Sequence, residues 1–226
     1  MDHTRPLHNI WASTSASWSH VAGAGIGLTP VAACVQSVVF HRWKFSMGET
    51  YPSQAHFYWV VSHKDVQAYR WFVARLKEVQ DCVVNMRKKN SETMSSKFFR
   101  FHIYVTSVKE SKETKEGSHQ SDADFWGVPS KESDIVTERA HFSKMDLYNA
   151  LLYPKRDHHV LGDIHIWKGR PNWDDRFQEV SESNPKGPVG VMFCGNRHIG
   201  ADLKDKCVKF SSVAQGRMFK LHKENF

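Results

Sequence analysis

Apolar runs typical of β-strands alternate with segments of helical period along most of this chain, and that alternation is what most constrains its fold. Five runs are rich in apolar, β-branched and aromatic residues: 19–23, 55–61, 98–107, 188–194 and 217–222. Within one of them, residues 189–193 stay apolar without alternating, which is typical of a strand buried on both faces of a parallel sheet.

Between these runs, apolar residues recur at three- and four-residue steps, as on one face of a helix. The positions that carry this period are Val66, Tyr69, Val73 and Leu76 in one segment, and Trp173, Phe177 and Val180 in another. Asp65 is placed to cap the first segment, and Asn196 opens a third helix that ends near Phe210. We therefore expect an α/β fold, Rossmann-like, with three layers: a parallel five-stranded sheet with helices on both faces.

Length and composition suit one domain with additions. The chain has 226 residues, 40% of them hydrophobic, which is enough for one substantial core. We expect a poorly defined N-terminal extension over 1–18 and a single domain over 19–226. Two stretches, at about 86–97 and 108–139, are rich in Lys, Glu, Ser and Asp, and we expect mobile insertions there.

Charge and cysteine content limit the classes of function. No run approaches the roughly 18 apolar residues of a membrane-spanning helix, and the first residues lack the apolar segment of a secretory signal, so we expect a cytoplasmic protein. The four cysteines are too far apart for a zinc-finger spacing and indicate no disulfide framework. The net charge of +7 suits an anionic partner: a nucleotide, a nucleic acid or an acidic membrane surface.

A glycine-rich segment follows the first strand-like run and leads into a helical pattern. It reads Gly23-Ala24-Gly25-Ile26-Gly27-Leu28-Thr29-Pro30. Glycines let the backbone approach a pyrophosphate closely, and the N–H groups at a helix start point at its oxygens. Thr29 suits the N-cap and Pro30 the first helical position. The same glycine spacing also occurs in ordinary strand-to-helix turns, so both interpretations stay open.

Five motifs in order now carry a resemblance to a known family. They are the glycine segment, His56-Phe57-Tyr58-Trp59-Val60, Gly169-Arg170-Pro171-Asn172-Trp173, Phe193-Cys194-Gly195, and His222-Lys223-Glu224-Asn225-Phe226. From about Val21 to the last residue, outside the two insertions, the chain resembles the C-terminal NADPH-binding domain of the NADPH oxidases and ferric reductases, in the ferredoxin-NADP reductase superfamily.

The resemblance implies the cofactors and partners of a flavoprotein. In that family NADPH gives hydride to an FAD held by a preceding β-barrel, and electrons then pass through haems in a membrane domain to oxygen, giving superoxide or hydrogen peroxide. The chain would then lie at the cytosolic face of a membrane as part of a longer protein. It has room for neither the flavin-binding nor the haem-containing domain, so we expect it to be inactive alone.

The resemblance also assigns residues to the nicotinamide and flavin side of the site. Cys194 with Gly195 would line the nicotinamide pocket, Glu224 matches an acidic position next to the cysteine, and Phe226 would cover the flavin ring. A buried strand cysteine and a terminal Phe packed in a core are the plain alternatives. The family continues Cys-Gly-Pro where this chain has Asn196, which still suits a helix cap.

Three basic residues are candidates for the 2'-phosphate of NADPH. Arg170 stands between a glycine and a proline, and the resemblance places its guanidinium near that phosphate. The family's arginine after Tyr-Trp-Val is missing, so His63 or Lys64 would supply the second charge, in a segment that is about two residues longer than usual. A plain surface arginine is the alternative for Arg170.

Other classes of function receive less support. A non-catalytic nucleotide-binding remnant and a ferric-chelate reductase fragment are the main alternatives to an oxidase domain. A basic run at Arg87-Lys88-Lys89 is not accompanied by any nucleic-acid-binding motif, so we expect no nucleic acid partner. The spacing of His158, His159 and His165 matches no zinc pattern, so we expect no metal.

Overall fold

The computed structural model describes residues 18–42, 54–89, 99–108, 142–154, 157–183 and 186–224. Seven strands form one sheet: β1 (Trp18–Ala24), β2 (Gln54–Ser62), β3 (Phe99–Thr106), β4 (His158–Leu161), β5 (Ile164–Lys168), β6 (Gly187–Cys194) and β7 (Arg217–Glu224). The five helices are α2 (Leu28–Gln36), α4 (Arg70–Lys89), α6 (Lys144–Leu152), α7 (Trp173–Ser183) and α8 (Arg197–Phe210). Shorter helical turns are η1 (Gly25–Gly27), η2 (Ser37–Arg42) and η3 (His63–Tyr69).

The sheet is wound in both directions from its centre. Its strand order is β4-β5-β3-β2-β1-β6-β7. Every neighbouring pair is parallel except β4 and β5, which form an antiparallel pair at one end. The chain moves outward from β1 through β2 and β3 to β5, and then returns to place β6 on the other side of β1. The switch point of this topology therefore lies between β1 and β6.

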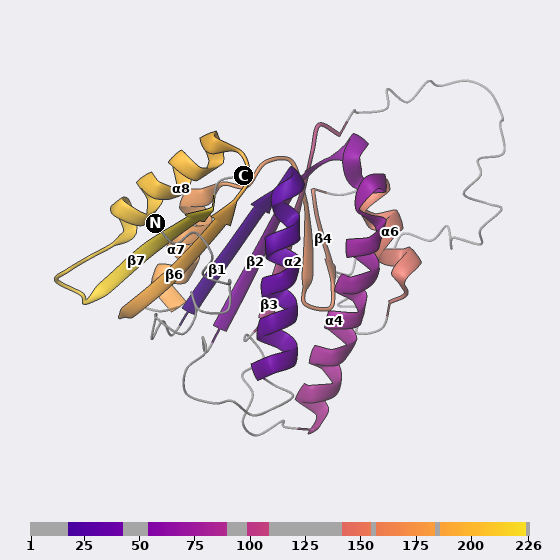
Figure 1. Cartoon of the computed structure of the whole chain (residues 1–226), viewed down its shortest axis with the longest axis horizontal. Helices are drawn as coiled ribbons and strands as arrows, with labels where there is room; N and C mark the ends of the chain where they lie inside the picture. Colours follow the sequence, from indigo (N-terminus) through magenta and orange to yellow (C-terminus); the bar gives the residue numbers. More distant parts are fainter. Residues whose placement is uncertain are drawn as a thin grey trace, which may run out of the picture.

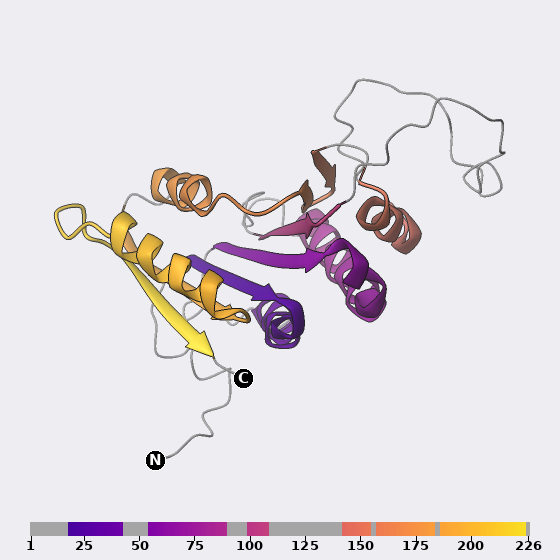
Figure 2. The ribbon, with the colours of Figure 1, turned by 90° about the horizontal axis from the view of Figure 1, so that it is seen from above.

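Helices cover both faces of the sheet, as expected from the sequence. Figures 1 and 2 show α2 and α4 on one face and α7 and α8 on the other. The larger core lies under α2 and α4 and includes buried α6 residues, and the smaller core lies under α7 and α8. The α/β class and the three layers are thus confirmed.

The five expected strands are all present, and two more were not expected. β2 illustrates why the central strands were predictable: its residues from Ala55 to Trp59 are all buried, as in a strand covered on both faces. β4 and β5 were missed because they are short and rich in histidine. β5 buries Ile164 and Ile166 on one face only, and such a brief alternation is a weak strand signal.

Helix ends show which local predictions hold. Asn196 caps α8, and its side-chain oxygen accepts a hydrogen bond from the backbone N–H of His198 at 2.8 Å. α8 ends at Phe210, as predicted. Ser143 and Asp146 form a reciprocal capping box at the start of α6, which the sequence analysis did not identify.

Two predicted helix starts are wrong. Thr29 is not the N-cap of α2, because the chain leaves β1 through the tight turn η1 and the helix begins at Leu28, with Gly27 as its cap residue. Pro30 is consequently the third helical residue and is buried. Asp65 does not cap α4 either, because it lies inside η3, and α4 begins at Arg70.

The boundary of the first expected insertion also differs from the structure. α4 continues to Lys89, past the expected start at about 86, and Arg87 is held by an ion pair with Asp163 at 2.8 Å. The rest of this stretch, nearly all of the second insertion and residues 1–17 lie outside the described residues. Among the helices that are described, none is long and apolar enough to cross a membrane.

Candidate functional site

Two glycine-bearing turns meet at the switch point of the sheet. β1 and β6 are parallel neighbours with Gly23 opposite Cys194, so both strands end at the same edge. β1 exits into Gly25, which has a φ of 56° and is exposed, and β6 exits into Gly195, which has a φ of 139°. Both angles fall where residues with a Cβ atom are strained, so the tight exits depend on glycine.

The two turns approach so closely that side chains are excluded between them. A Cβ atom on Gly27 would lie 2.1 Å from the carbonyl oxygen of Cys194, and one on Gly195 would lie 2.9 Å from the carbonyl oxygen of Ala24. Gly23 is restricted from behind, because its Cβ would lie 2.6 Å from the Val31 side chain. By contrast, a Cβ on Gly25 would meet nothing within 4 Å. The turn therefore packs tightly inside and presents open backbone at Gly25.

Cys194 ends β6 as a buried thiol beside an acidic residue. It is 1% exposed and faces Glu224 of β7 as its direct partner in the strand register. Burial first, and then the negative charge of Glu224, raise the pKa of this thiol. The thiol therefore stays protonated at neutral pH, which suits a packing wall better than a nucleophile. The sequence prediction that an acidic residue neighbours the cysteine is matched by this register.

The basic candidates lie at the same edge, beyond the ends of β2 and β5. Lys64 and Arg170 are exposed, and neither forms an ion pair with another described residue. His63 differs, because its Nε2 lies 2.6 Å from the carbonyl oxygen of Leu152 at the end of α6. The His63 ring is thus occupied by a contact within the protein, which favours Lys64 as the phosphate ligand.

Arg170 is presented by a fixed turn. Gly169 has a φ of 105°, and its N–H donates to the carbonyl oxygen of Val105 in β3 at 2.9 Å. Sequence reasoning missed Ser107 just beyond β3, which has a φ of 59°. A serine in this left-handed region is uncommon, and such strain often marks a functional edge. No feature of the sequence around Ser107 indicates this conformation.

The remaining predicted site residues are placed as follows. Thr29 is exposed on the first turn of α2, whereas Pro30 is buried, so Pro30 serves packing rather than contact with a ligand. The side chain of Ile26 and the whole of Phe226 lie outside the described residues. Within the described ranges, no group of three or more His, Cys, Asp or Glu side chains is arranged to hold a metal ion.

This geometry agrees with a comparison against protein families. The model of the family described as "Ferric reductase NAD binding domain" matches residues 20–208, which include both glycine exits and Cys194. The chain belongs to this family. Glu224 lies beyond the matched part of this ferric reductase NAD binding domain, so its place beside Cys194 is a separate observation.

Curated relatives of this ferric reductase NAD binding domain include several oxidases. The chain is 27% identical to human NADPH oxidase 3 over 90% of its own length and 28% of the relative. It is 26% identical to human NADPH oxidase 5 over 98% of its own length and 25% of that protein. It is also 24% identical to a superoxide-generating NADPH oxidase heavy chain of Dictyostelium discoideum, over 91% and 31%. The chain therefore spans about a quarter to a third of these relatives.

Proposed function

We propose that this chain is the NADPH-binding domain of an NADPH oxidase-like flavoprotein and delivers hydride from NADPH to an FAD held mainly by another domain. The single observation that carries the proposal is the contact between the two glycine turns at the β1 and β6 exits, where a Cβ on Gly27 would overlap the Cys194 backbone. Open α/β sheets bind their ligands at this switch point, outside the carboxyl ends of the strands.

The edge has the features that a dinucleotide phosphate needs. The open backbone at Gly25 allows a pyrophosphate to approach, and the first N–H groups of α2 point toward the same side. Lys64 and Arg170 are exposed cations at the same edge and suit the 2'-phosphate. An adenine dinucleotide with three phosphate groups therefore fits the charges and the steric openings on this side of the sheet.

Cys194 and Glu224 would act at the nicotinamide end. Bound NADPH supplies the hydride. The protonated Cys194 thiol would provide a polarisable, uncharged wall for the ring, and Glu224 would keep that thiol protonated through its negative charge. Gly195 would let the ring approach, because a side chain there would meet Ala24. Phe226 would cover the flavin, as the resemblance implies.

The final electron acceptor is the part of the proposal with a specific competitor. Names of relatives such as the superoxide-generating oxidase of Dictyostelium discoideum favour oxygen as the acceptor. The description of the matching family favours a ferric substrate instead. Both schemes place the same demand on this chain, which is to bring NADPH to a flavin at the cytosolic face of a membrane.

A fusion experiment tests the proposed hydride delivery. The 226-residue chain is joined to the FAD-binding domain of a related oxidase, and FAD reduction by NADPH is followed by anaerobic stopped-flow absorbance. We expect the fusion to bleach the flavin and the isolated chain to reduce no dye, because hydride has no acceptor without FAD. A fusion that binds NADPH without reducing FAD would instead support a non-catalytic nucleotide-binding remnant.

A further inference from the structure

A row of histidines crosses the face of the sheet that α7 covers. Five strands contribute one ring each, and we call this set the histidine row: His20, His56, His102, His165 and His158. Successive ring centroids lie 5.3, 5.7, 5.1 and 5.4 Å apart. His20, His56 and His102 are buried, at 6%, 4% and 1% exposed. Such a run of adjacent titratable rings has no part in the proposed nucleotide site.

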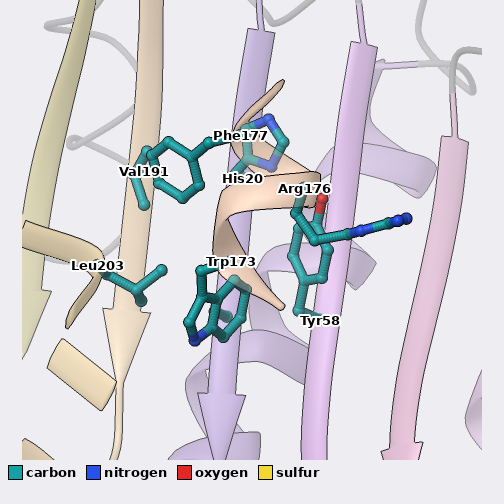
Figure 3. A pocket seen from close by; sticks show the side chains of 8 residues that line it. His20, Tyr58, Trp173, Arg176, Phe177, Val191 and Leu203 are labelled. Carbon is teal, nitrogen blue, oxygen red and sulfur yellow. The ribbon is translucent and has the colours of Figure 1, made fainter. Parts of the chain in front are cut away.

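α7 lies over this row and is held there by contacts with each part of it. Phe177 stacks on His20 with centroids 6.3 Å apart, and Trp173 packs edge-on against Tyr58 at 5.5 Å. Figure 3 shows Trp173 and Phe177 over the strand residues His20 and Tyr58. They enclose a small cavity of about 10 Å³, roughly the space that one water molecule needs.

The other end of α7 is attached by charged groups. Glu179 accepts hydrogen bonds from Arg100 of β3 at 2.8 Å and from Arg176 at 3.0 Å, and the Arg176 guanidinium lies 5.2 Å from the centre of the Trp167 ring. The titratable or charged groups around the row are Arg100 and Tyr104 of β3, Tyr58 of β2, His159 of β4, and Asp175, Arg176 and Glu179 of α7. Because Glu179 already balances two arginines, it is poorly placed to neutralise an added proton.

The contacts within the row require neutral imidazoles. His158 Nε2 and His165 Nδ1 lie 3.2 Å apart, so one nitrogen must donate and the other must accept. If both rings were protonated, two N–H groups would face each other. Both ring nitrogens of His102 are buried without a hydrogen-bond partner in the described part of the chain. A charged His102 would therefore be buried with nothing to stabilise its charge.

We propose that the histidine row is an acid-sensitive latch for α7, closed while the rings are neutral and opened by the protons that they take up when α7 leaves the sheet. Burial, the largest cause, lowers the pKa of His20 to about 3 and of His165 to about 4, and it lowers those of His56 and His102 well below the usual value. Acid therefore favours the open state, in which the rings regain ordinary pKa values.

The latch is connected to the candidate site through the chain itself. α7 begins at Trp173, and the turn that carries Arg170 immediately precedes it. Opening of α7 would release one end of that turn and weaken the grip of Arg170 on a phosphate. This consequence rests on the proposed function, whereas the opening of α7 does not.

Hydrogen exchange of the whole chain tests the latch. Protection of the α7 amides is compared at about pH 7.5 and about pH 5.5, after correction for the intrinsic exchange rates. Each histidine that becomes exposed on opening, with an ordinary pKa of about 6.5, should raise the opening equilibrium about tenfold between these values. His102→Phe removes one such group, so its acid-induced loss of protection should be about tenfold smaller than that of the wild type.

Two further variants make the result decisive. His165→Phe, at the partly exposed end of the row, should reduce the loss in the same way if His102→Phe does not fold. His198→Gln, an exposed residue of α8, is the control and should behave as the wild type. Equal losses in wild type and row variants, or loss of protection in step across the central strands and α7, would overturn the latch.

NADPH titrations at the same two pH values separate the latch from the proposed function. NADPH affinity that falls together with α7 protection, and falls less in His102→Phe, supports the connection to Arg170. Affinity that is unchanged while α7 opens contradicts that connection. Absence of NADPH binding at both pH values overturns the proposed function, while the exchange measurement still decides whether the latch exists.

Discussion

Gly27 lies directly against Cys194, so that a Cβ atom on the glycine would come within 2.1 Å of the cysteine carbonyl oxygen. These residues are 167 positions apart in the sequence, yet they join the exits of the two central strands. The contact fixes the distance between the proposed pyrophosphate turn and the proposed nicotinamide pocket. Any change that separates the two residues should therefore affect both stability and nucleotide binding.

Gly27→Ala should destabilise the fold. The added methyl group meets backbone atoms of Cys194, which cannot rotate away as a side chain would. We expect a loss of about 1 to 3 kcal/mol in the free energy of unfolding, the usual cost of overpacking, measured by urea denaturation. Gly25→Asn is the matched control, because that position is open and asparagine tolerates a positive φ. A Gly27→Ala protein as stable as the control would disprove the close contact.

His63→Ala should affect stability rather than the choice of nucleotide. The His63 ring contacts the Leu152 carbonyl oxygen and thereby ties the exit of β2 to the end of α6. Loss of this hydrogen bond should cost about 1 kcal/mol in urea denaturation and leave the ratio of NADPH to NADH affinity unchanged. A selective loss of NADPH affinity would show that His63 contacts the 2'-phosphate after all.

Arg170→Ala and Lys64→Ala should weaken NADPH selectively. A charge-assisted contact contributes about 1.5 to 3 kcal/mol, so each loss should reduce NADPH affinity roughly ten- to a hundredfold. NADH lacks the 2'-phosphate and should bind almost equally to variants and wild type. Isothermal calorimetry with both nucleotides measures this. Equal losses for the two nucleotides would place these cations at the pyrophosphate or in the fold.

Mild acid should destabilise the whole chain. The pKa of His20 is lowered to about 3 and that of His165 to about 4, so between these values and about 6.5 the unfolded chain binds protons that the folded chain does not. Stability is therefore complete above about pH 6.5 and is lost as the pH falls. Each of the two should cost about 1.4 kcal/mol between about pH 7.5 and pH 5.5. Urea denaturation of wild type and His20→Phe at both pH values tests this, and parallel curves would refute it.

The sequence predicted what depends on local pattern. The uninterrupted apolar residues of β6 identified a strand covered on both faces, and the glycines after β1 identified the turn at the switch point. The Asn196 cap followed from side-chain chemistry alone. These features are recognisable because each depends on a few neighbouring residues.

What escaped prediction depends on contacts between distant residues. Thr29 has the chemistry of a cap, but the tight η1 turn starts the helix earlier than that chemistry suggests. The histidines of β4 and β5 look solvated in sequence, and only the cover of α7 and the neighbouring strands reveals them as one row. The occupation of His63 by Leu152 was equally invisible, because α6 is remote in the chain.

The most direct test of the central claim is NADPH binding by the whole chain with a charge placed at the β1 exit. Gly25→Asp and Gly25→Asn both tolerate the positive φ and the open surroundings, and they differ only in charge. Calorimetry should show NADPH binding to wild type and Gly25→Asn, with Gly25→Asp weakened roughly ten- to a hundredfold by repulsion of the pyrophosphate. Equal NADPH affinity in the two variants would contradict dinucleotide binding at the β1 and β6 exits.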